Sequence, residues 1–261
     1  MKNIDKPVYP RRIHIAPVGY EIDRIVLPLI EMEADKVYLI TEKRKEDDTG
    51  LFYVKEIENR LSKLKRPIEI ENRGTDIVGR DLYDTLRIYR QIAEEESGNH
   101  IFVNVSTGTK IHAIAGMMTC MIFRKEENLF TPYYAVPSDY DNEPEAGQQI
   151  SIGCKEIKKM PNYRIEKPPD ELIDVLEVLS KARSKYNSIS KKILIEELEN
   201  SGIKLLNEKS KDGLVAKYNA LQRKYIIPLI EWDYITLDYS GNRPVIKITP
   251  EGINALSFLK D

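Results

Sequence analysis

Cysteine, net charge and long apolar runs are all scarce in this 261-residue sequence. The two cysteines, Cys120 and Cys154, stand apart, which excludes a Cys-x-x-Cys zinc site and a disulfide framework and favours a reducing compartment. A net charge of −2 excludes attachment to nucleic acid by bulk charge. The longest largely apolar run, residues 111–123, is too short to span a bilayer, and residues 1–12 lack the apolar core of a signal peptide. We therefore expect a cytoplasmic protein without a membrane segment.

Metal ligands and the familiar nucleotide motifs are also lacking. The three histidines, His14, His100 and His112, are scattered singly, and isolated histidines are more often structural than metal-binding. No Gly-x-Gly-x-x-Gly follows the first expected strand, and no Gly-x-x-x-x-Gly-Lys-Ser/Thr occurs, which argues against a dinucleotide fold and a P-loop nucleotidase. We predict no metal site and no cofactor.

Short strands alternate with longer amphipathic segments in the first part of the chain. Strands are expected at residues 12–16, 36–40, 67–70, 100–105 and 132–136, with one more within 149–157. Apolar residues at spacings of three and four indicate helices over 22–33, 46–64, 77–95 and 111–123. Pro28 is expected to kink the first helix or to delay its start. This alternation predicts an α/β fold with a doubly wound, mainly parallel, Rossmann-like sheet.

The second part of the chain has a different pattern. A polar, proline-rich stretch at residues 161–170 is expected to link a domain at 1–160 to a domain at 171–261. Helices are expected over 171–182, 190–198 and 213–225, then two strands at 232–239 and 243–248, and a last helix capped by Thr249. Ser210 or Asp212 is expected to cap the third helix, whose core-facing residues would be Leu214, Tyr218, Leu221 and Tyr225. This order predicts a mainly α winged helix-turn-helix domain.

Two loops stand out at the carboxyl ends of the first and fourth expected strands. In a doubly wound sheet, ligands bind where the strand order reverses, which is commonly between these two strands. The loops are Pro17-Val18-Gly19-Tyr20 and Ser106-Thr107-Gly108-Thr109-Lys110. The second combines hydroxyls, a glycine and a lysine at a helix start, where N–H groups and the helix dipole favour an anion. Simple helix capping by Ser106 or Thr107 is the alternative. We predict that both loops bind a phosphate-bearing ligand, with Tyr20 either stacking on a base or packing.

The run Asn104-Val105-Ser106-Thr107-Gly108-Thr109-Lys110 resembles the strand-four signature of CARF domains, the CRISPR-associated Rossmann-fold sensors, which is close to Asn-x-Thr-Gly-Gly-Thr-Lys. One glycine of that pattern is replaced here, so the loop is expected to be less permissive. The first loop sits where the family has its strand-one ligand loop. With the C-terminal domain included, the chain resembles archaeal CARF–winged-helix regulators. The resemblance implies a homodimer with a composite pocket for a cyclic oligoadenylate, with cyclic tetra-adenylate expected, and a role in CRISPR antiviral defence.

The third helix and the wing of the C-terminal domain carry the polar residues that would contact double-stranded DNA. Asn and Gln side chains can read adenine and Arg can read guanine in the major groove. The candidates are Lys211, Lys217, Asn219, Gln222, Arg223 and Lys224 on or before the helix, and Asn242 and Arg243 in the wing. The domain's acids roughly cancel its bases, so a winged helix used only for protein contact or dimerisation stays open.

The leading hypothesis is a CRISPR-linked transcription regulator in which the ligand changes the spacing of two winged helices on DNA. An enzymatic alternative is a ring nuclease that places a ribose 2′-hydroxyl for in-line attack, with Ser106 and Lys110 as the candidate catalytic residues. A sensor of another nucleotide also stays open, because a helix N-terminus selects phosphate and does not read a base.

Overall fold

The computed structural model describes residues 9–42, 49–75, 81–124, 129–141, 148–206, 213–239 and 244–260. The chain divides into two compact units, Met1–Glu166 and Lys167–Asp261. Within the expected linker, the Asn162 side chain donates to the Phe130 carbonyl at 2.8 Å and the Ile165 N–H donates to the Met121 carbonyl at 3.1 Å. These bonds attach that part of the linker to the first unit. Among the described residues, no helix is both long and apolar enough to cross a membrane.

A six-stranded sheet of order β3-β2-β1-β4-β5-β8 forms the centre of the first unit. Its parallel strands are β1 (Arg12–Pro17), β2 (Lys36–Glu42), β3 (Glu69–Thr75), β4 (His100–Asn104) and β5 (Leu129–Val136). β8 (Glu156–Lys159) pairs antiparallel with β5, while β6 (Asp139–Tyr140) and β7 (Ser151–Ile152) form a separate ladder. The mainly parallel, doubly wound α/β architecture is confirmed.

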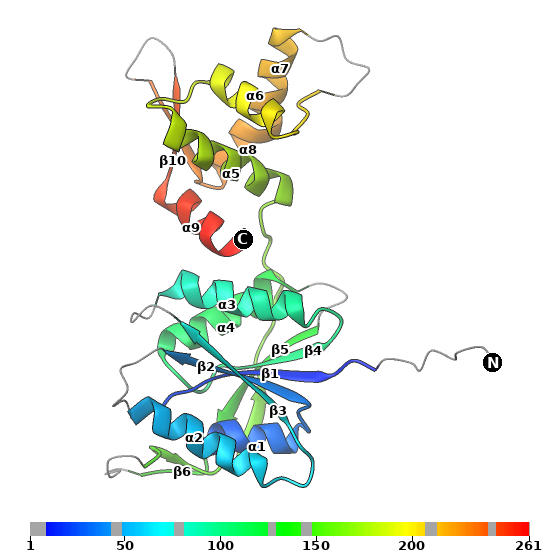
Figure 1. Cartoon of the computed structure of the whole chain (residues 1–261), viewed down its shortest axis with the longest axis vertical. Helices are drawn as coiled ribbons and strands as arrows, with labels where there is room; N and C mark the ends of the chain where they lie inside the picture. Colours follow the sequence, from blue (N-terminus) through cyan, green and yellow to red (C-terminus); the bar gives the residue numbers. More distant parts are fainter. Residues whose placement is uncertain are drawn as a thin grey trace, which may run out of the picture. The chain divides into compact units, whose positions relative to one another are not determined.

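Two helices cover each face of the sheet (Figure 1). The helices α1 (Asp23–Glu31) and α2 (Thr49–Ser62) lie on one face, and α3 (Leu82–Glu95) and α4 (Lys110–Ile122) lie on the other. A continuous core joins Ile25 and Leu29 of α1 and Ile57 of α2 to Val37 and Leu39 of β2. Residues 36–40 of β2 are all buried, because helices cover both faces of the sheet.

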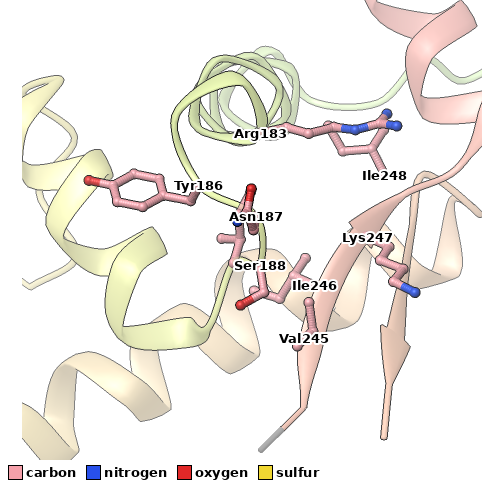
Figure 2. Close-up of a pocket in the computed structure, with 9 residues that line it drawn as sticks. Arg183, Tyr186, Asn187, Ser188, Val245, Ile246, Lys247 and Ile248 are labelled. Atoms are coloured by element: carbon pink, nitrogen blue, oxygen red, sulfur yellow. The ribbon is translucent and has the colours of Figure 1, made fainter. Parts of the chain in front are cut away.

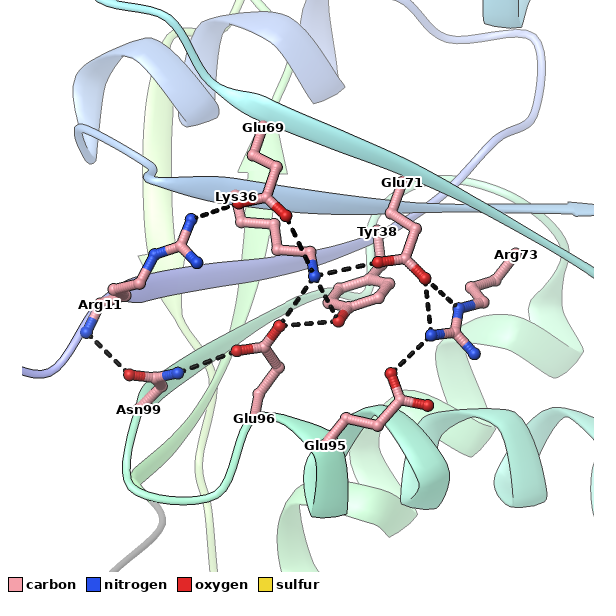
Figure 3. Close-up of polar contacts among 9 residues, drawn as sticks. All are labelled: Arg11, Lys36, Tyr38, Glu69, Glu71, Arg73, Glu95, Glu96 and Asn99. Atoms are coloured by element: carbon pink, nitrogen blue, oxygen red, sulfur yellow. Dashed lines mark hydrogen bonds and ion pairs between the residues drawn. The ribbon is translucent and has the colours of Figure 1, made fainter.

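The third strand is longer and more polar than predicted, because its side chains enter a charged network (Figure 3). It begins at Glu69 and continues through the polar residues to Thr75. The Lys36 ammonium lies 3.4 Å from Glu69, 2.9 Å from Glu71 and 3.0 Å from Glu96, and it donates to the Tyr38 hydroxyl at 2.7 Å. A strand is recognised in a sequence by alternating apolar residues. β3 lacks this alternation, because it is an edge strand whose glutamate side chains form ion pairs.

The second unit is a winged helix domain. Its helices are α5 (Asp170–Lys185), α6 (Lys191–Asn200), α7 (Leu214–Leu221), a π-helical turn η1 (Gln222–Ile226), α8 (Ile227–Glu231) and α9 (Pro250–Leu259), and its strands are β9 (Ile235–Asp238) and β10 (Val245–Ile248). Ser190 caps α6 and Thr249 caps α9, each by accepting a backbone N–H bond, as predicted. Leu176, Leu198, Leu221 and Ile235 lie in one buried core.

The third helix of this unit differs from the prediction at both ends. It begins after Gly213 without a side-chain cap, and Ser210 and Asp212 lie outside the described residues. It continues past Tyr225 to Glu231, because a π turn, in which the Ile227 N–H donates to the Gln222 carbonyl, brings Pro228 into the first turn of α8. A proline is tolerated there because its missing N–H is not needed. Leu214, which we expected in the core, is 55% exposed.

Candidate anion-binding site

The two candidate loops lie against each other at one edge of the sheet. β1 and β4 are neighbours with Ile15 opposite Val103, so their carboxyl ends meet where the strand order reverses, as predicted. The contact between the loops is made by glycines: a Cβ on Gly19 would lie 3.0 Å from the backbone nitrogen of Gly108. Any side chain at Gly19 would therefore push the loops apart.

Gly108 is required by both its conformation and its surroundings. Its φ is +74°, a backbone conformation that residues with a side chain rarely adopt. A Cβ at this position would also lie 2.5 Å from the Cβ of Pro17 and 2.8 Å from Nδ1 of His112. Gly108 itself is exposed to solvent.

The N-terminus of α4 is capped by Thr109, and not by Ser106 or Thr107 as the capping alternative supposed. The Thr109 hydroxyl accepts the His112 N–H at 3.3 Å, and Nδ1 of His112 accepts the Thr109 N–H at 3.1 Å. This is a capping box in which histidine replaces the usual Glu or Gln. The sequence signal for this cap is a threonine three residues before a polar residue. His112 is buried and has a structural role.

The capping box leaves several backbone donors for a ligand. No described residue accepts a hydrogen bond from the N–H groups of Gly108, Lys110 or Ile111. Unpaired N–H groups in the first turn of a helix carry partial positive charge, which the helix dipole adds to. Lys110, also at this end, is exposed and brings a full positive charge. The arrangement therefore suits an anion such as a phosphate group.

The Asn104 side chain is hydrogen-bonded both to the turn at Ser106 and to α1. Its side-chain oxygen accepts bonds from the Ser106 backbone N–H at 2.9 Å and from the Ser106 hydroxyl, and its amide donates to the Arg24 carbonyl at 2.8 Å. That carbonyl is available because Pro28, four residues later, has no N–H to donate to it. The Ser106 hydroxyl also accepts the Ala135 N–H at 3.1 Å. Both hydrogen-bonding roles of Ser106 are thus taken by the protein.

Arg24 is a buried cation at this edge that sequence reasoning missed. It is 5% exposed; its Nε donates to the Ala135 carbonyl at 2.8 Å, and its guanidinium lies 5.0 Å from the centre of the Tyr134 ring. Glu21 lies 3.7 Å away. The remaining terminal nitrogen has no partner among the described residues. A buried arginine on an apolar helix face gave no sequence signal that separates it from a surface residue.

The predicted loop residues differ in what they offer a ligand. Tyr20, Gly108 and Lys110 are exposed, and Val18, Gly19, Ser106 and Thr109 are half-buried. Pro17 and Thr107 are buried, and the Thr107 hydroxyl has no partner among the described residues. Exposed groups therefore concentrate at the tip of the second loop, from Gly108 to Lys110.

The N-terminus of α1, which starts at the same edge, is already bonded to the protein. The side-chain oxygen of Gln149 accepts the N–H groups of Ile22 at 3.2 Å and Asp23 at 2.9 Å, at the start of α1. The Glu21 carboxylate accepts the Ser151 N–H at 3.2 Å, and the Asp23 carboxylate accepts the Gly153 N–H at 2.7 Å. Residues 149–153 thus occupy the hydrogen-bonding groups at the start of α1.

The predicted DNA-contacting residues are only partly free. Lys217 lies 2.7 Å from Glu199, and the Lys224 ammonium donates to the Leu205 carbonyl at 3.3 Å. The Gln222 side-chain oxygen is buried without a partner among the described residues. Asn219 and Arg223 are exposed. Lys211, Asn242 and Arg243 lie outside the described residues.

The same helix also exposes apolar side chains. Val215 is 73% exposed, Ile227 42% and Ile230 37%. With Asn219 and Arg223 they form a mixed face, which fits a contact with thymine methyl groups and base edges and also fits a protein contact.

A cavity of about 270 Å³ lies between the end of α5 and β10 in the winged helix domain (Figure 2). Arg183, Asn187 and Ser188 supply its polar lining, and Val245 and Ile246 are among its apolar residues. Lys247 also lines it, but its ammonium lies 2.5 Å from the Asp238 carboxylate. No motif in the sequence pointed to this cavity.

His14 is a core residue. It is fully buried, its ring stacks on Phe102 with centroids 4.9 Å apart, and its Nδ1 lies 3.3 Å from the Tyr133 hydroxyl. Burial, with a smaller contribution from Arg12, lowers the pKa of His14 to about 3. The imidazole is therefore neutral at physiological pH.

Comparison with known proteins gives a family match for each domain. Residues 12–140 match the family described as HFX_2341_N-like, N-terminal, and residues 171–260 match the DUF6293 C-terminal winged helix domain. The uncharacterized protein MJ1513 of Methanocaldococcus jannaschii is 28% identical over 236 residues, covering 81% of this chain and 68% of that protein.

Two solved structures are similar at low identity. One is Enterococcus italicus Csm6 bound to cyclic hexa-2′-fluoro-hexa-dAMP, with 12% identity, a TM-score of 0.42, and coverage of 85% of this chain and 56% of that one. The other is Can2 from Sulfobacillus thermosulfidooxidans in complex with cyclic tetra-adenylate, with 13% identity, a TM-score of 0.38, and coverage of 95% and 63%. The chain thus spans less than two thirds of either protein. Each domain thus matches a family model, and the match of residues 171–260 agrees with the winged helix domain seen in the structure.

Proposed function

We propose that this protein binds a cyclic oligoadenylate, with cyclic tetra-adenylate as the expected form, and thereby controls the binding of its winged helix domain to double-stranded DNA. The observation that carries the proposal is the set of N–H groups at Gly108, Lys110 and Ile111 that have no acceptor among the described residues, beside the exposed Lys110 side chain. A phosphate of the ligand would accept these bonds. The strand-four signature, which resembles that of CARF domains, supports the choice of ligand.

A homodimer would bring two such turns to one ligand. A cyclic oligoadenylate with two-fold symmetry presents the same phosphates to each protomer, so an isologous dimer uses both halves of the ring. The α4 helix begins at the ligand turn and offers an apolar surface for a second copy: Ile114 is 49% exposed, and Met117, Met118 and Met121 are half-buried. Methionine side chains adapt readily to a partner surface.

The winged helix domain supplies the output of the proposed sensor. Ligand binding at the dimer would change the spacing of two winged helices, and spacing must match the helical repeat of DNA for both to bind. The proposed role is transcription regulation linked to CRISPR antiviral defence.

Gel-shift titration of DNA from the protein's own promoter region tests the proposal. We expect cyclic tetra-adenylate to change the apparent Kd for DNA by about 5- to 150-fold, the usual range for coupled sites. Linear tetra-adenylate is the matched control and should have less effect. Absence of DNA binding at low salt, with and without the cyclic ligand, would overturn the proposed function. The recovered ligand is also analysed for cleavage, since a cut ring would favour the ring-nuclease alternative.

Arg223 is the exposed cation that we expect to contribute most to DNA binding. Replacing Arg223 by alanine should weaken binding by about 5- to 100-fold and reduce its dependence on salt, because a charged contact to a base or phosphate is lost. Lys181→Ala is the control, since the Lys181 side chain is 69% exposed and lies on α5, away from the third helix. Equal affinities of the two variants, measured by fluorescence anisotropy at several salt concentrations, would show that the third helix does not read DNA.

A further inference from the structure

Three large apolar side chains are exposed near the candidate anion-binding site. Tyr20 is 44% exposed and directly follows Gly19, the residue that contacts Gly108. Leu51 and Phe52, in the first turn of α2, are 47% and 49% exposed. The Tyr20 and Phe52 rings belong to one cluster, because each of them contacts the Tyr53 ring.

The exposed rings of Tyr20 and Phe52 both contact the same buried residue, Tyr53. The Tyr53 ring is 2% exposed and makes edge contacts with Tyr20, at a centroid distance of 5.4 Å, and with Phe52, at 5.5 Å. The Tyr53 hydroxyl donates to the Gln148 carbonyl at 2.7 Å. Because Tyr53 is fixed by burial and by this bond, the two exposed rings are held in place before any ligand arrives, which lowers the entropy cost of binding.

A continuous chain of contacts joins these rings to the anion-binding turn. Gly108 lies against Gly19, Tyr20 follows Gly19, and Tyr53 contacts both Tyr20 and Phe52. A nucleotide carries a phosphate and a flat aromatic base in one molecule, and this edge of the sheet offers donors for the first and rings for the second. Binding of a protein partner would not require phosphate-binding N–H groups and aromatic rings together.

We propose that Phe52 and Tyr20 form a stacking platform for a purine base of the ligand whose phosphate binds the N-terminus of α4, and that Tyr53 is a positioning residue for both rings. This inference rests on the proposed function and deepens it, because the unpaired N–H groups select phosphate alone. Base–aromatic stacking tolerates any base, so the platform supplies affinity for a nucleobase and leaves the choice of base to other groups.

The test compares Phe52→Leu, Phe52→Tyr and the control Tyr163→Leu, since Tyr163 is 73% exposed and lies outside this cluster. Binding of cyclic tetra-adenylate is measured by calorimetry. Binding of 2-aminopurine riboside monophosphate is measured by quenching of its fluorescence, which reports stacking directly. Ribose 5-phosphate, which has no base, competes for the phosphate position. Thermal melting of each variant checks that the fold is retained.

Loss of one stacked base should weaken binding by about 5- to 100-fold. We expect Phe52→Leu to show this loss for both adenine ligands and to reduce the quenching, while Phe52→Tyr and Tyr163→Leu stay close to wild type and ribose 5-phosphate binds all variants equally. Unchanged binding of cyclic tetra-adenylate by a folded Phe52→Leu protein would overturn the platform and leave the proposed function standing. If wild type bound neither adenine ligand, both proposals would fail.

Discussion

Replacing Gly108 by alanine should lower the free energy of unfolding by about 2–5 kcal/mol and remove binding of phosphate ligands. The left-handed backbone at φ +74° costs about 1–2 kcal/mol for a residue with a Cβ. The new Cβ must also displace Pro17 and His112, from which it would lie 2.5 Å and 2.8 Å, and such overpacking costs about 1–3 kcal/mol. Both displaced groups hold the turn, so its N–H groups would no longer converge. Denaturant unfolding and calorimetry measure the two effects.

Gly98→Ala is the matched control for this change. Gly98 has a φ of +87°, similar to that of Gly108, but a Cβ there would meet no atom within 4 Å. The control therefore carries only the backbone cost of about 1–2 kcal/mol and should leave ligand binding unchanged. If Gly98→Ala and Gly108→Ala destabilise the protein equally, the packing of the two loops is not what requires glycine.

Replacing Lys36 by methionine should lower the free energy of unfolding by about 2–4 kcal/mol at pH 7. Its side chain is 9% exposed, and removing it leaves three carboxylates, Glu69, Glu71 and Glu96, around an apolar group (Figure 3). Breaking a fully buried ion pair costs about 3–5 kcal/mol, and partial exposure of Glu69 and Glu71 reduces that figure. Lys247→Met is the control, because its pair with Asp238 is 59% exposed on the lysine side and should contribute less than about 1 kcal/mol.

The effect of Lys36→Met should diminish as the pH falls. Burial alone raises the pKa of Glu71 and of Glu96, but bonds from Lys36 to both, from Arg73 to Glu71, and from Tyr38 to Glu96 outweigh it, so both pKa values lie below the usual 4.5. Groups with a lowered folded-state pKa stabilise the fold above the unfolded-state pKa and lose this contribution as the pH falls through the folded-state value. The difference between wild type and variant should therefore shrink below about pH 4.5. An equal difference at pH 7 and pH 3.5 in urea unfolding would contradict this account.

The periodicity of apolar residues in the sequence was enough to predict the layers of the fold, because this periodicity is determined by which side chains are buried. Ile25, Leu29 and Ile57 recur at helical spacing and are buried together. The same rule failed for residues 71–75 of β3, since that edge strand has polar side chains such as Glu71, which pairs with Lys36 from the neighbouring strand. The sequence pattern of residues 69–75 alone cannot show that Lys36, on the neighbouring strand, lies beside them.

The candidate site could be located from the sequence but not built from it. Loop composition after two strands pointed to Gly19 and Gly108, which do lie in contact. The choice of Thr109 as the cap depends on the orientation of His112, and the burial of Arg24 depends on β5. The burial of Arg24 joins residues that are distant in sequence, and so does the bond between Gln149 and Asp23, which are 126 positions apart.

The bonds from Gln149, Ser151 and Gly153 to the start of α1 have a consequence for how the first unit is made. During synthesis, α1 leaves the ribosome long before the segment that caps it, so its first N–H groups stay open to water until Gln149 has emerged. Closing a loop of this length costs entropy that only late contacts repay, which slows folding. A fragment that ends at residue 140, where the N-terminal family match ends, would leave the strand-one loop uncovered. The shortest fragment of the first unit that keeps all of these bonds to α1 therefore extends at least to Gly153.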